Sequence, residues 1–492
     1  MRTLSSKRAS KLFVNAIVLI YSFALACSIN KPANTFIKNT QTNQNLIPEG
    51  KTAIFCSNWD EFVIAAAKAI PGDVIQLKNG IYSGNITFSK SGTAEQPILI
   101  IPESRGNAII NGNSKWVIDG KYVTVDGFYF KDGTSTNPIN FSLASSHSRF
   151  INSAVTGWNL GSGKDTRLVT IMGTFNEVGY CFLRAKDTPG MMLEVVRTSS
   201  ARNDHNIHHV YFGYFKDPGL GNGFETVRIS TSGFSLSSSY TTLENCIFER
   251  CDGESEIISS KSGHNTFRNN TFLNSDGALT LRHGHDALVE GNFFINTLNR
   301  TSSRCNGVRV IGERQVVRNN YFLNLPMNSQ AIQIEYGNTV PHKLTFYDQV
   351  KDAVIEHNTI LNCDKGVRIG ASKNRGMEPP RIMAPYGIFR NNHIATDKGN
   401  NASLEIEEEV LSKKLFAYSN NLINGKVNTI PSVQNLPDGI IVKDIIGNFS
   451  FKGAEAGVQN KNAKPLYQQD IAPYWVKVKL EAKDPDFVGQ PW

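Results

Sequence analysis

Long apolar stretches, helix-like apolar periodicity and blocks of basic residues are all missing from this 492-residue chain. Without an apolar run of about 18 residues there is no ordinary membrane-spanning helix, and the missing helical spacing excludes a helical bundle. The lack of Lys/Arg blocks argues against a nucleic-acid-binding arm. Charged residues make up only 19% of the chain, which excludes a charge-rich disordered protein. This length ordinarily gives about two to four domains, and a single elongated repeat structure is the main exception.

Cysteine is scarce, and the seven cysteines match neither a metal knuckle nor a dense disulfide framework in their spacing. We expect most of them to be small apolar residues of the core. Export would permit some pairing, and the sequence does not specify which. The cysteines are Cys27, Cys56, Cys181, Cys246, Cys251, Cys305 and Cys363.

The first 26 residues have the features of an export signal. Four basic residues (Arg2, Lys7, Arg8 and Lys11) precede a mostly apolar stretch over residues 12–26, which is short for a bilayer span. Ala24-Leu25-Ala26-Cys27 is similar to a bacterial lipoprotein box, so Cys27 is the expected lipidation site. We predict an exported protein that is periplasmic, anchored to the outer membrane or secreted, with a polar linker over residues 27–50.

The mildly basic charge balance is consistent with an anionic ligand but is not strong evidence for one. The formal net charge is +8, and removing the signal leaves 47 basic against 43 acidic residues, a net of +4. The expected partner is an anionic polysaccharide. We expect no nucleic acid, no membrane contact beyond the lipid anchor, and a monomer.

One short pattern recurs along the chain: Asn, any residue, then an aromatic or aliphatic residue. Most steps between its copies are 22–28 residues, the size of one coil of a parallel β-helix, and the longer steps predict loops that shape a groove. Asn at the same position of each coil suits a tight bend, where its side chain can point inward, bond the backbone of the turn and stack in a ladder from coil to coil. Its copies begin at Asn270, Asn292, Asn320, Asn358, Asn392 and Asn420, and Cys246-Ile-Phe248 follows the same spacing.

The ends of the repeat region are also predictable. Residues 57–69 indicate a short amphipathic helix with Ser57 as N-cap, which would cover the open end of the first coil. The fold class expected is therefore all-β, a single-stranded right-handed parallel β-helix over residues 51–450 with an N-terminal capping helix. Residues 451–492 lack the repeat and form a C-terminal extension of unassigned role.

The densest polar segment is Asp252-Gly-Glu254-Ser-Glu256-Ile-Ile-Ser-Ser-Lys261. Glu254 and Glu256 are two residues apart, so both are expected on one face of a strand. Taken alone, such a pair is more often a solvated acidic face than a site for a hard cation. Lys261 precedes Arg282 by 21 residues, about one coil, so the two should stack beside each other, with His283 next in sequence. A Lys, Arg and His cluster beside two carboxylates is typical of an active site.

The neighbouring coils add further polar residues. Asn222, between two glycines, can offer an amide oxygen to the same cation, although a turn role explains it equally well. Arg228 and Arg309 lie one coil upstream and downstream and can face a groove, or they can be ordinary strand-edge charges.

The segments DGESEIISSKS, LTLRHG, NGFETVRIS and NGVRVIGERQVVRNNYF resemble polysaccharide lyase family 6, which contains alginate lyases and chondroitinase B. The resemblance runs from about residue 70 to about residue 370 and implies a right-handed parallel β-helix. It implies Ca²⁺ held by Asn222, Glu254 and Glu256, with Lys261 as general base and Arg282 as general acid or its partner. His283, Arg228 and Arg309 are then expected to bind substrate. Residues 133–165 depart from the pattern of typical alginate lyases, which bears on substrate choice.

The function predicted is Ca²⁺-assisted β-elimination on a uronic-acid polysaccharide, giving a 4,5-unsaturated uronate at the non-reducing end. Alginate is the first choice of substrate, and dermatan or chondroitin sulfate is the alternative. A hydrolase on the same fold would leave Lys261 and Arg282 unexplained. A glycan-binding β-helix without catalysis is the other alternative, because a fold alone does not decide function.

Overall fold

The computed structural model describes one β-helical unit and no part of the predicted export signal. The described residues are 46–217, 219, 221–302, 304–338, 344–374, 379–396, 402–430, 438, 440–442, 456–460, 463–466, 468–471, 473 and 475–476. The signal, Cys27 and most of the linker therefore lie outside the described residues. Within these ranges, every helix is too short or too polar to cross a membrane.

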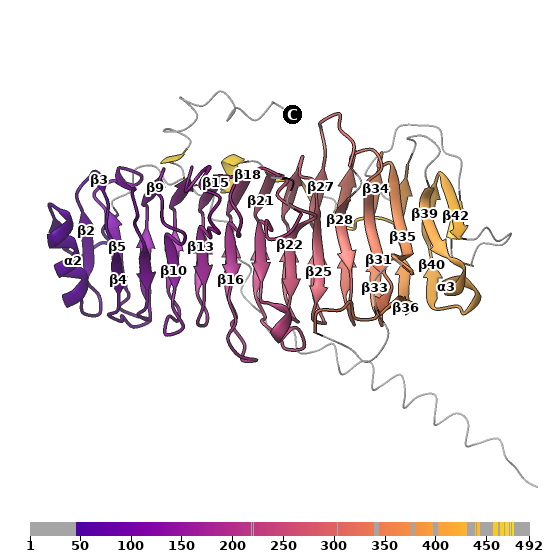
Figure 1. Cartoon of the computed structure of the whole chain (residues 1–492), viewed down its shortest axis with the longest axis horizontal. Coiled ribbons are helices and arrows are strands. Elements are labelled where there is room, and N and C mark those ends of the chain that lie inside the picture. Colours follow the sequence, from indigo (N-terminus) through magenta and orange to yellow (C-terminus); the bar gives the residue numbers. More distant parts are fainter. Residues whose placement is uncertain are drawn as a thin grey trace, which may run out of the picture. The chain divides into compact units, whose positions relative to one another are not determined.

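Three long parallel sheets make up this unit, and each coil adds one short strand to each sheet (Figure 1). This confirms the predicted parallel β-helix. Sheet A consists of β1 (Ala53–Cys56), β2 (Val74–Leu77), β5 (Ile98–Pro102), β8 (Val123–Asp126), β11 (Arg149–Ile151), β14 (Glu177–Gly179), β17 (Asn206–His208), β20 (Thr242–Glu244), β23 (Thr266–Arg268), β26 (Leu288–Glu290), β29 (Val316–Arg318), β33 (Ala353–Glu356), β37 (Gly387–Arg390) and β40 (Phe416–Ser419).

Sheet B follows sheet A in each coil. Sheet B consists of β3 (Gly80–Tyr82), β6 (Ala108–Ile110), β9 (Tyr129–Lys131), β12 (Ala154–Thr156), β15 (Phe182–Lys186), β18 (Tyr211–Phe215), β21 (Ile247–Cys251), β24 (Thr271–Leu273), β27 (Phe293–Ile295), β30 (Tyr321–Leu323), β34 (Thr359–Leu361), β38 (His393–Ala395), β41 (Asn421–Asn424) and β43 (Ile440–Val442).

Sheet C completes each coil and carries the polar residues singled out above. Sheet C consists of β4 (Ile86–Phe88), β7 (Trp116–Ile118), β10 (Ile139–Phe141), β13 (Val169–Ile171), β16 (Leu193–Val195), β19 (Val227–Ile229), β22 (Glu256–Lys261), β25 (Ala278–His283), β28 (Cys305–Val310), β31 (Gln330–Glu335), β35 (Lys365–Ala371), β39 (Ala402–Glu407) and β42 (Lys426–Ile430). Its strands lengthen from β22 onward, where the polar segment that contains Glu256 and Lys261 begins.

The apolar residues of the repeat stack directly on one another inside the coils. Phe212, Phe248, Phe272, Phe294 and Phe322 form a buried column with ring centroids 4.5–4.8 Å apart and nearly parallel planes. This spacing is that of neighbouring strands in a sheet, so the sequence repeat reports the coil register directly.

A buried asparagine ladder runs beside this column, as predicted. Each amide oxygen accepts bonds from the backbone N–H and the side-chain amide of the asparagine one coil earlier. The last member is Asn421, not the predicted Asn420, because Asn420 takes a left-handed turn conformation with φ of 51° just before the ladder position. The members are Asn270, Asn292, Asn320, Asn358, Asn392 and Asn421.

The capping helix α2 (Trp59–Lys68) begins one residue later than predicted. Its N-cap is Asn58, whose side chain accepts the Glu61 N–H, whereas the Ser57 N–H donates to the Glu61 carboxylate. Phe62 and Ala66 are the residues that α2 buries against the first coils. This is a variant of the capping box, because the Glu61 carboxylate accepts the N–H of Ser57 and the side-chain amide of Asn58 instead of the Asn58 backbone N–H.

The cysteines of the described chain are all buried and unpaired by disulfides, at positions 56, 181, 246, 251, 305 and 363. Cys246 occupies the asparagine position of the ladder, and its backbone N–H donates to Asn270. The prediction that most cysteines are small core residues is confirmed for these six.

The C-terminal extension packs against the outer face of sheet B over its described residues. Trp475 lies against Tyr129, with ring centroids 5.5 Å apart, and its indole N–H donates to the Asn152 carbonyl. Val458 contacts the later coils through Thr359. The extension, which includes α4 (Gln468–Ile471), thus runs back along sheet B toward the first coils and covers apolar residues there.

Candidate active site

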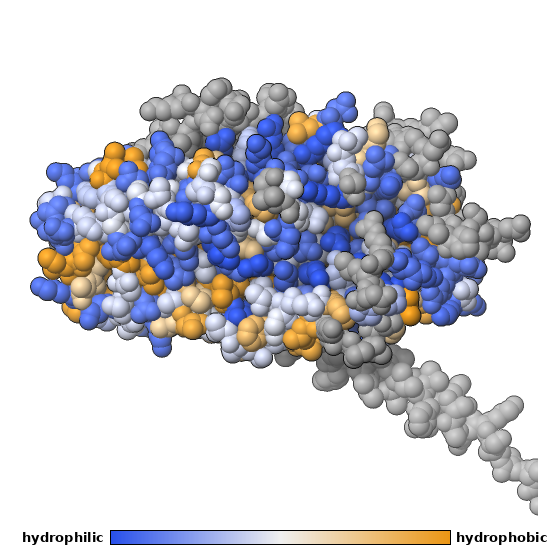
Figure 2. Space-filling view, viewed as in Figure 1, coloured by the Kyte–Doolittle hydropathy of each residue, from blue (hydrophilic) through white to orange (hydrophobic). Residues whose placement is uncertain are grey.

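The candidate site lies on the outer face of sheet C, where one column of side chains runs across consecutive strands. The register pairs Arg228 with Ser259, Ser259 with Thr280, and Thr280 with Arg309. Figure 2 shows mainly hydrophilic residues over the strands that Figure 1 labels β22 and β25. The arginines predicted from separate motifs therefore belong to one polar surface.

Lys261 and Arg282 both lie at the ends of their strands, but they are not register partners. A one-residue shift after Ser260 pairs Lys261 with His283. The predicted spacing of 21 residues holds for Ser259 and Thr280 and fails at the strand ends because β25 bulges there. Both side chains keep partial exposure, 19% in each case, which leaves them accessible from solvent.

Glu225, which the sequence analysis left unassigned, is the carboxylate nearest to Lys261. Its Oε1 lies 3.5 Å from the Lys261 Nζ and 3.9 Å from an Arg228 nitrogen. Its Oε2 is buried and has no hydrogen-bond partner. The side chain is only 3% exposed, so its charge is compensated mainly by these two cations.

Glu254 and Glu256 occupy different local environments. Glu254 precedes β22 and accepts the Phe224 N–H at 2.9 Å, whereas Glu256 is the first residue of the strand and accepts the Ser259 hydroxyl at 2.5 Å. Contrary to the prediction, they do not both belong to one strand, because Glu254 lies just before β22 and Glu256 begins it. Burial raises the pKa of Glu254 to about 7, and the negative charges of Glu225 and Glu256 act in the same direction.

Arg282 is held on several sides at once. One guanidinium nitrogen donates to the Thr345 carbonyl at 2.9 Å, and Nε lies 3.9 Å from the Glu256 Oε1. The guanidinium also lies 4.2 Å from the centre of the Tyr347 ring. Burial lowers the pKa of Arg282, and the positive charges of Arg309 and Arg381 lower it further. Tyr347 and Glu256 act to raise this pKa but do not outweigh burial.

His283 lies beside Arg282 and is only 1% exposed. Its Nδ1 is 3.4 Å from an Arg282 nitrogen and its Nε2 is 3.1 Å from the Ser232 hydroxyl. Little of the His283 side chain is therefore exposed, and its observed contacts are with Arg282 and Ser232. The predicted substrate-binding role of His283 stays a prediction.

Arg309 and Arg228 each bridge carboxylates. Arg309 lies 3.4 Å from Glu256 and 3.3 Å from Glu335, and it donates to the Tyr347 hydroxyl at 2.8 Å. Burial acts to lower the pKa of Arg309, but Glu335, Tyr347 and Glu256 outweigh it and hold this pKa above its usual range. Arg228 bonds to the buried Glu194 and faces Glu225.

Asn222 is the predicted residue that the structure does not bring into contact with the carboxylates. It is exposed on the loop before β19, between Gly221 and Gly223, whose φ values are +81° and +86°. Among the described residues, no group of three or more His, Cys, Asp or Glu side chains has the arrangement of a closed metal site.

The acidic group still suits a hard divalent cation. Glu225 has an unpartnered buried oxygen, and the pKa of Glu254 is raised first by burial and then by the negative charges of Glu225 and Glu256. Oxygen-only donors of this kind fit Ca²⁺, which takes flexible sets of carboxylate and amide oxygens.

Glu225 and Tyr347 are the two important residues that the sequence analysis missed. Val227 and Ile258 are register partners on neighbouring coils, and each follows a glutamate by two residues, Glu225 and Glu256 respectively. An alignment of the two coils would therefore have found Glu225. Tyr347 lies on the long connection between β31 and β33, which accounts for the 38-residue step in the repeat. That connection is fastened through β32 (Gly337–Asn338), which pairs with β36 (Arg381–Met383).

Comparisons with known proteins agree with this arrangement. Residues 56–468 match the family described as chondroitinase B. The structure of AlyGC, an alginate lyase of polysaccharide lyase family 6, superposes with a TM-score of 0.74 at 28% identity, covering 86% of this chain and 59% of AlyGC. A mannuronic-acid-specific family 6 lyase from the human gut microbiota gives a TM-score of 0.66 at 25% identity, covering 80% of this chain and 91% of that enzyme.

A shorter similarity links the chain to pectate lyase L of Dickeya chrysanthemi, with 35% identity over 122 residues, or 21% of this chain. The match spans only 29% of that enzyme's length. The family assignment depends instead on the match over residues 56–468, which contains nearly all of the β-helix and every polar residue described above. The chain therefore belongs to the chondroitinase B family, that is, to polysaccharide lyase family 6.

Proposed function

We propose that the protein is a polysaccharide lyase that cleaves a uronic-acid polymer by β-elimination, with alginate as its substrate. The observation that carries this proposal is the placement of Lys261 and Arg282 at adjacent strand ends, beside the carboxylates of Glu225 and Glu256. The similarity to two family 6 lyases that act on alginate or mannuronate favours alginate over dermatan sulfate.

The chemistry begins at the carbon next to the uronate carboxylate. Lys261, in its neutral form, takes the C5 proton onto Nζ, and the electrons of the C5–H bond form the C4–C5 double bond as the C4–O4 bond breaks. The leaving O4 receives a proton from water or from the Lys261 ammonium. The product then carries a 4,5-unsaturated uronate at its non-reducing end.

Arg282 serves this reaction as a fixed positive charge. A guanidinium is a poor proton donor, so its role is to stabilise negative charge that develops on the substrate carboxylate. Its contacts with Thr345, His283 and Tyr347 hold it in place before substrate arrives. Arg228 and Arg309 extend the positive surface to either side for further carboxylates of the polymer.

Asn222, Glu254 and Glu256 are the residues proposed to hold Ca²⁺, with Glu225 beside them. When bound, the ion would supply positive charge against the substrate carboxylate and so make the C5 proton more acidic. Asn222 would have to turn its amide oxygen toward Glu254, and the flanking glycines allow this because both already occupy left-handed conformations.

The experiment that tests the function follows ultraviolet absorbance of the unsaturated product on alginate, dermatan sulfate and pectate. We expect a rise on alginate, which EDTA suppresses. A rise only on dermatan sulfate would move the substrate to the alternative prediction. No rise on any of the three, from a protein with the melting behaviour of a folded chain, would favour a glycan-binding β-helix instead.

Calcium should stabilise the fold in a pH-dependent way. Because the pKa of Glu254 lies near 7, above that of an exposed carboxyl, its ionisation destabilises the folded state as pH rises from about 4.5 to about 7. At pH 8, Ca²⁺ at about 100 times its Kd should add about 2.7 kcal/mol to the free energy of unfolding and raise the Tm. At pH 5, where Glu254 is protonated, the rise in Tm should be much smaller. Differential scanning calorimetry of the wild type and of Glu254→Gln tests this. An equal rise in Tm in both proteins would place the ion elsewhere.

We also propose that the protein is exported and anchored through Cys27. The support is the basic and apolar pattern of residues 1–26. Fractionation of producing cells, comparing the wild type with Cys27→Ser, should show a shift from the membrane to the soluble fraction.

A further inference from the structure

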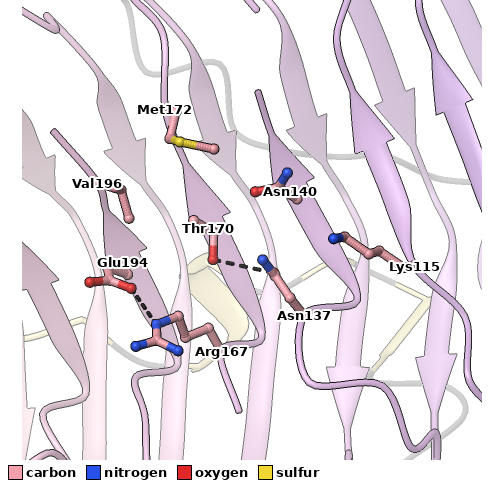
Figure 3. Close-up of a pocket in the computed structure, with 8 residues that line it drawn as sticks. All are labelled: Lys115, Asn137, Asn140, Arg167, Thr170, Met172, Glu194 and Val196. Carbon is pink, nitrogen blue, oxygen red and sulfur yellow. Dashed lines mark hydrogen bonds and ion pairs between the residues drawn. The ribbon is translucent and has the colours of Figure 1, made fainter. Parts of the chain in front are cut away.

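A hollow of about 480 Å³ lies on the outer face of sheet C, upstream of the catalytic strands. Its lining residues come from β10, β13 and β16 and from the turns beside them (Figure 3). This volume is within the usual range for small-ligand pockets. The lining residues are Lys115, Asn137, Asn140, Arg167, Thr170, Met172, Glu194 and Val196.

Lys115 is the cation of the hollow that is available to a ligand. It is exposed and, among the described residues, it makes no ion pair. Figure 3 shows its side chain extending toward Asn137 and Asn140. The Asn137 amide oxygen accepts the Thr170 hydroxyl at 3.2 Å, so its two N–H groups are left to donate. An ammonium beside amide donors matches the carboxylate or sulfate of an acidic sugar.

Two other features suit a sugar ring. Met172 and Val196 are half-buried and lie along one side of the hollow, which provides apolar contact for the C–H face of a ring. Asn140 and Thr170 occupy the outward column of sheet C, in register with each other. Asn140 is half-buried and offers its amide to ring hydroxyls, whereas the buried Thr170 holds Asn137 through its hydroxyl. The combination of one cation, amides and an apolar side is that of a carbohydrate site.

The hollow is joined to the candidate active site by a buried carboxylate. Glu194 is 3% exposed and bonds to Arg167 on the side of the hollow and to Arg228 on the side of the active site. Arg167 is also held by Asp165 at 2.8 Å. The two arginines neutralise the Glu194 carboxylate, so it does not repel an anionic ligand. In turn, Glu194 holds both guanidinium groups in place on sheet C.

The spacing of the coils sets how far the hollow lies from the reacting bond. β13 is three strands from β22 in the order of sheet C, and β7 is five. At about 4.8 Å for each strand, the hollow lies about 14–24 Å from Lys261 along the groove. A polymer bound at Lys261 and lying along the column of sheet C would pass directly over it.

We propose that this hollow is a remote subsite for one acidic sugar unit of the same polymer chain, with Lys115 binding its anionic group. This rests on the proposed function, because it takes the bound polymer to be the uronan cleaved at Lys261. It predicts that long oligomers gain affinity from Lys115 and that short ones, which cannot reach it, do not.

The test measures binding in the Lys261→Ala background, where substrate is not consumed. Isothermal titration of size-fractionated oligouronates, from trimers to oligomers of about ten units, compares this protein with Lys261→Ala/Lys115→Ala. We expect Kd for the longest oligomers to rise about three- to tenfold and Kd for trimers to stay unchanged. Lys261→Ala/Lys78→Ala, which removes an exposed lysine from the turn between sheets A and B, should match the parent at every length.

Equal affinities for long oligomers with and without Lys115 would overturn the subsite, as would an equal loss for trimers and long oligomers. Titration with both alginate and dermatan sulfate oligomers distinguishes a carboxylate from a sulfate as the bound group. If the wild type binds these oligomers through Lys115 but cleaves none, the proposed function fails and the subsite stands. If it cleaves them with no effect of Lys115, only the subsite fails.

Discussion

Lys261→Ala is expected to lower kcat on the preferred uronan by about 10³-fold while leaving KM within a few-fold of the wild type. The reason is that a positioned general base contributes about 10²–10⁴ to the rate. The Lys261 side chain lies at the end of β22, is partly exposed to solvent and has its Nζ 3.5 Å from Glu225, so its loss removes the proposed proton acceptor without opening the core. Initial rates of product absorbance at saturating polymer measure this directly.

Two controls make this result specific. Lys68→Ala removes an exposed lysine from the last turn of α2, at the capped end of the β-helix, and should keep full activity. Lys261→Ala should still unfold in one cooperative transition, which shows that the fold is intact, at a lower temperature than the wild type because the buried Glu225 loses one of its two cations. Activity within tenfold of the wild type would mean that another group takes the C5 proton, and the assignment of Lys261 would be wrong.

The second large effect is on stability and comes from the asparagine ladder. Asn320→Ala should lower the free energy of unfolding by about 3–5 kcal/mol, because each buried group left without a partner costs about 1–3 kcal/mol. The Asn320 amide oxygen accepts two bonds from Asn292, and its amide nitrogen donates to the Val289 carbonyl and to Asn358. The substitution removes the acceptor of the Asn292 backbone N–H. It also takes one partner each from the Asn292 side-chain amide, the Val289 carbonyl and the Asn358 amide oxygen.

Urea denaturation followed by circular dichroism measures that loss. Asn113→Ala replaces an exposed asparagine between β6 and β7 and should change stability by less than about 0.5 kcal/mol. A loss for Asn320→Ala as small as that of Asn113→Ala would show that the ladder is only a by-product of coil stacking.

The fold followed from the sequence because its repeat is set by local physics. The Phe248, Phe272, Phe294 and Phe322 column has the spacing of stacked strands, so a step of one coil in sequence is one strand in space. Errors occurred where two similar residues adjoin. Asn420 and Asn421 compete for one ladder position, and Ser57 and Asn58 compete for one N-cap, and in each case backbone conformation decides.

The candidate site was predictable where it depends on strands and not where it depends on loops. Coil arithmetic brought Arg228, Lys261 and Arg309 onto one face, and the structure places them there. It did not foresee the bulge that pairs Lys261 with His283, because a one-residue shift leaves no signature in the spacing. It also could not place Tyr347, whose backbone N–H donates to Asn338 of β32, the strand that pairs with β36.

The central claim, that this protein breaks its polymer by elimination, is tested most directly by digesting alginate in water enriched in heavy oxygen and weighing the products. Elimination adds no oxygen from water to the new ends, so we expect unsaturated oligomers without heavy oxygen. Products that carry heavy oxygen at the new reducing end and lack the double bond would show hydrolysis and contradict the account.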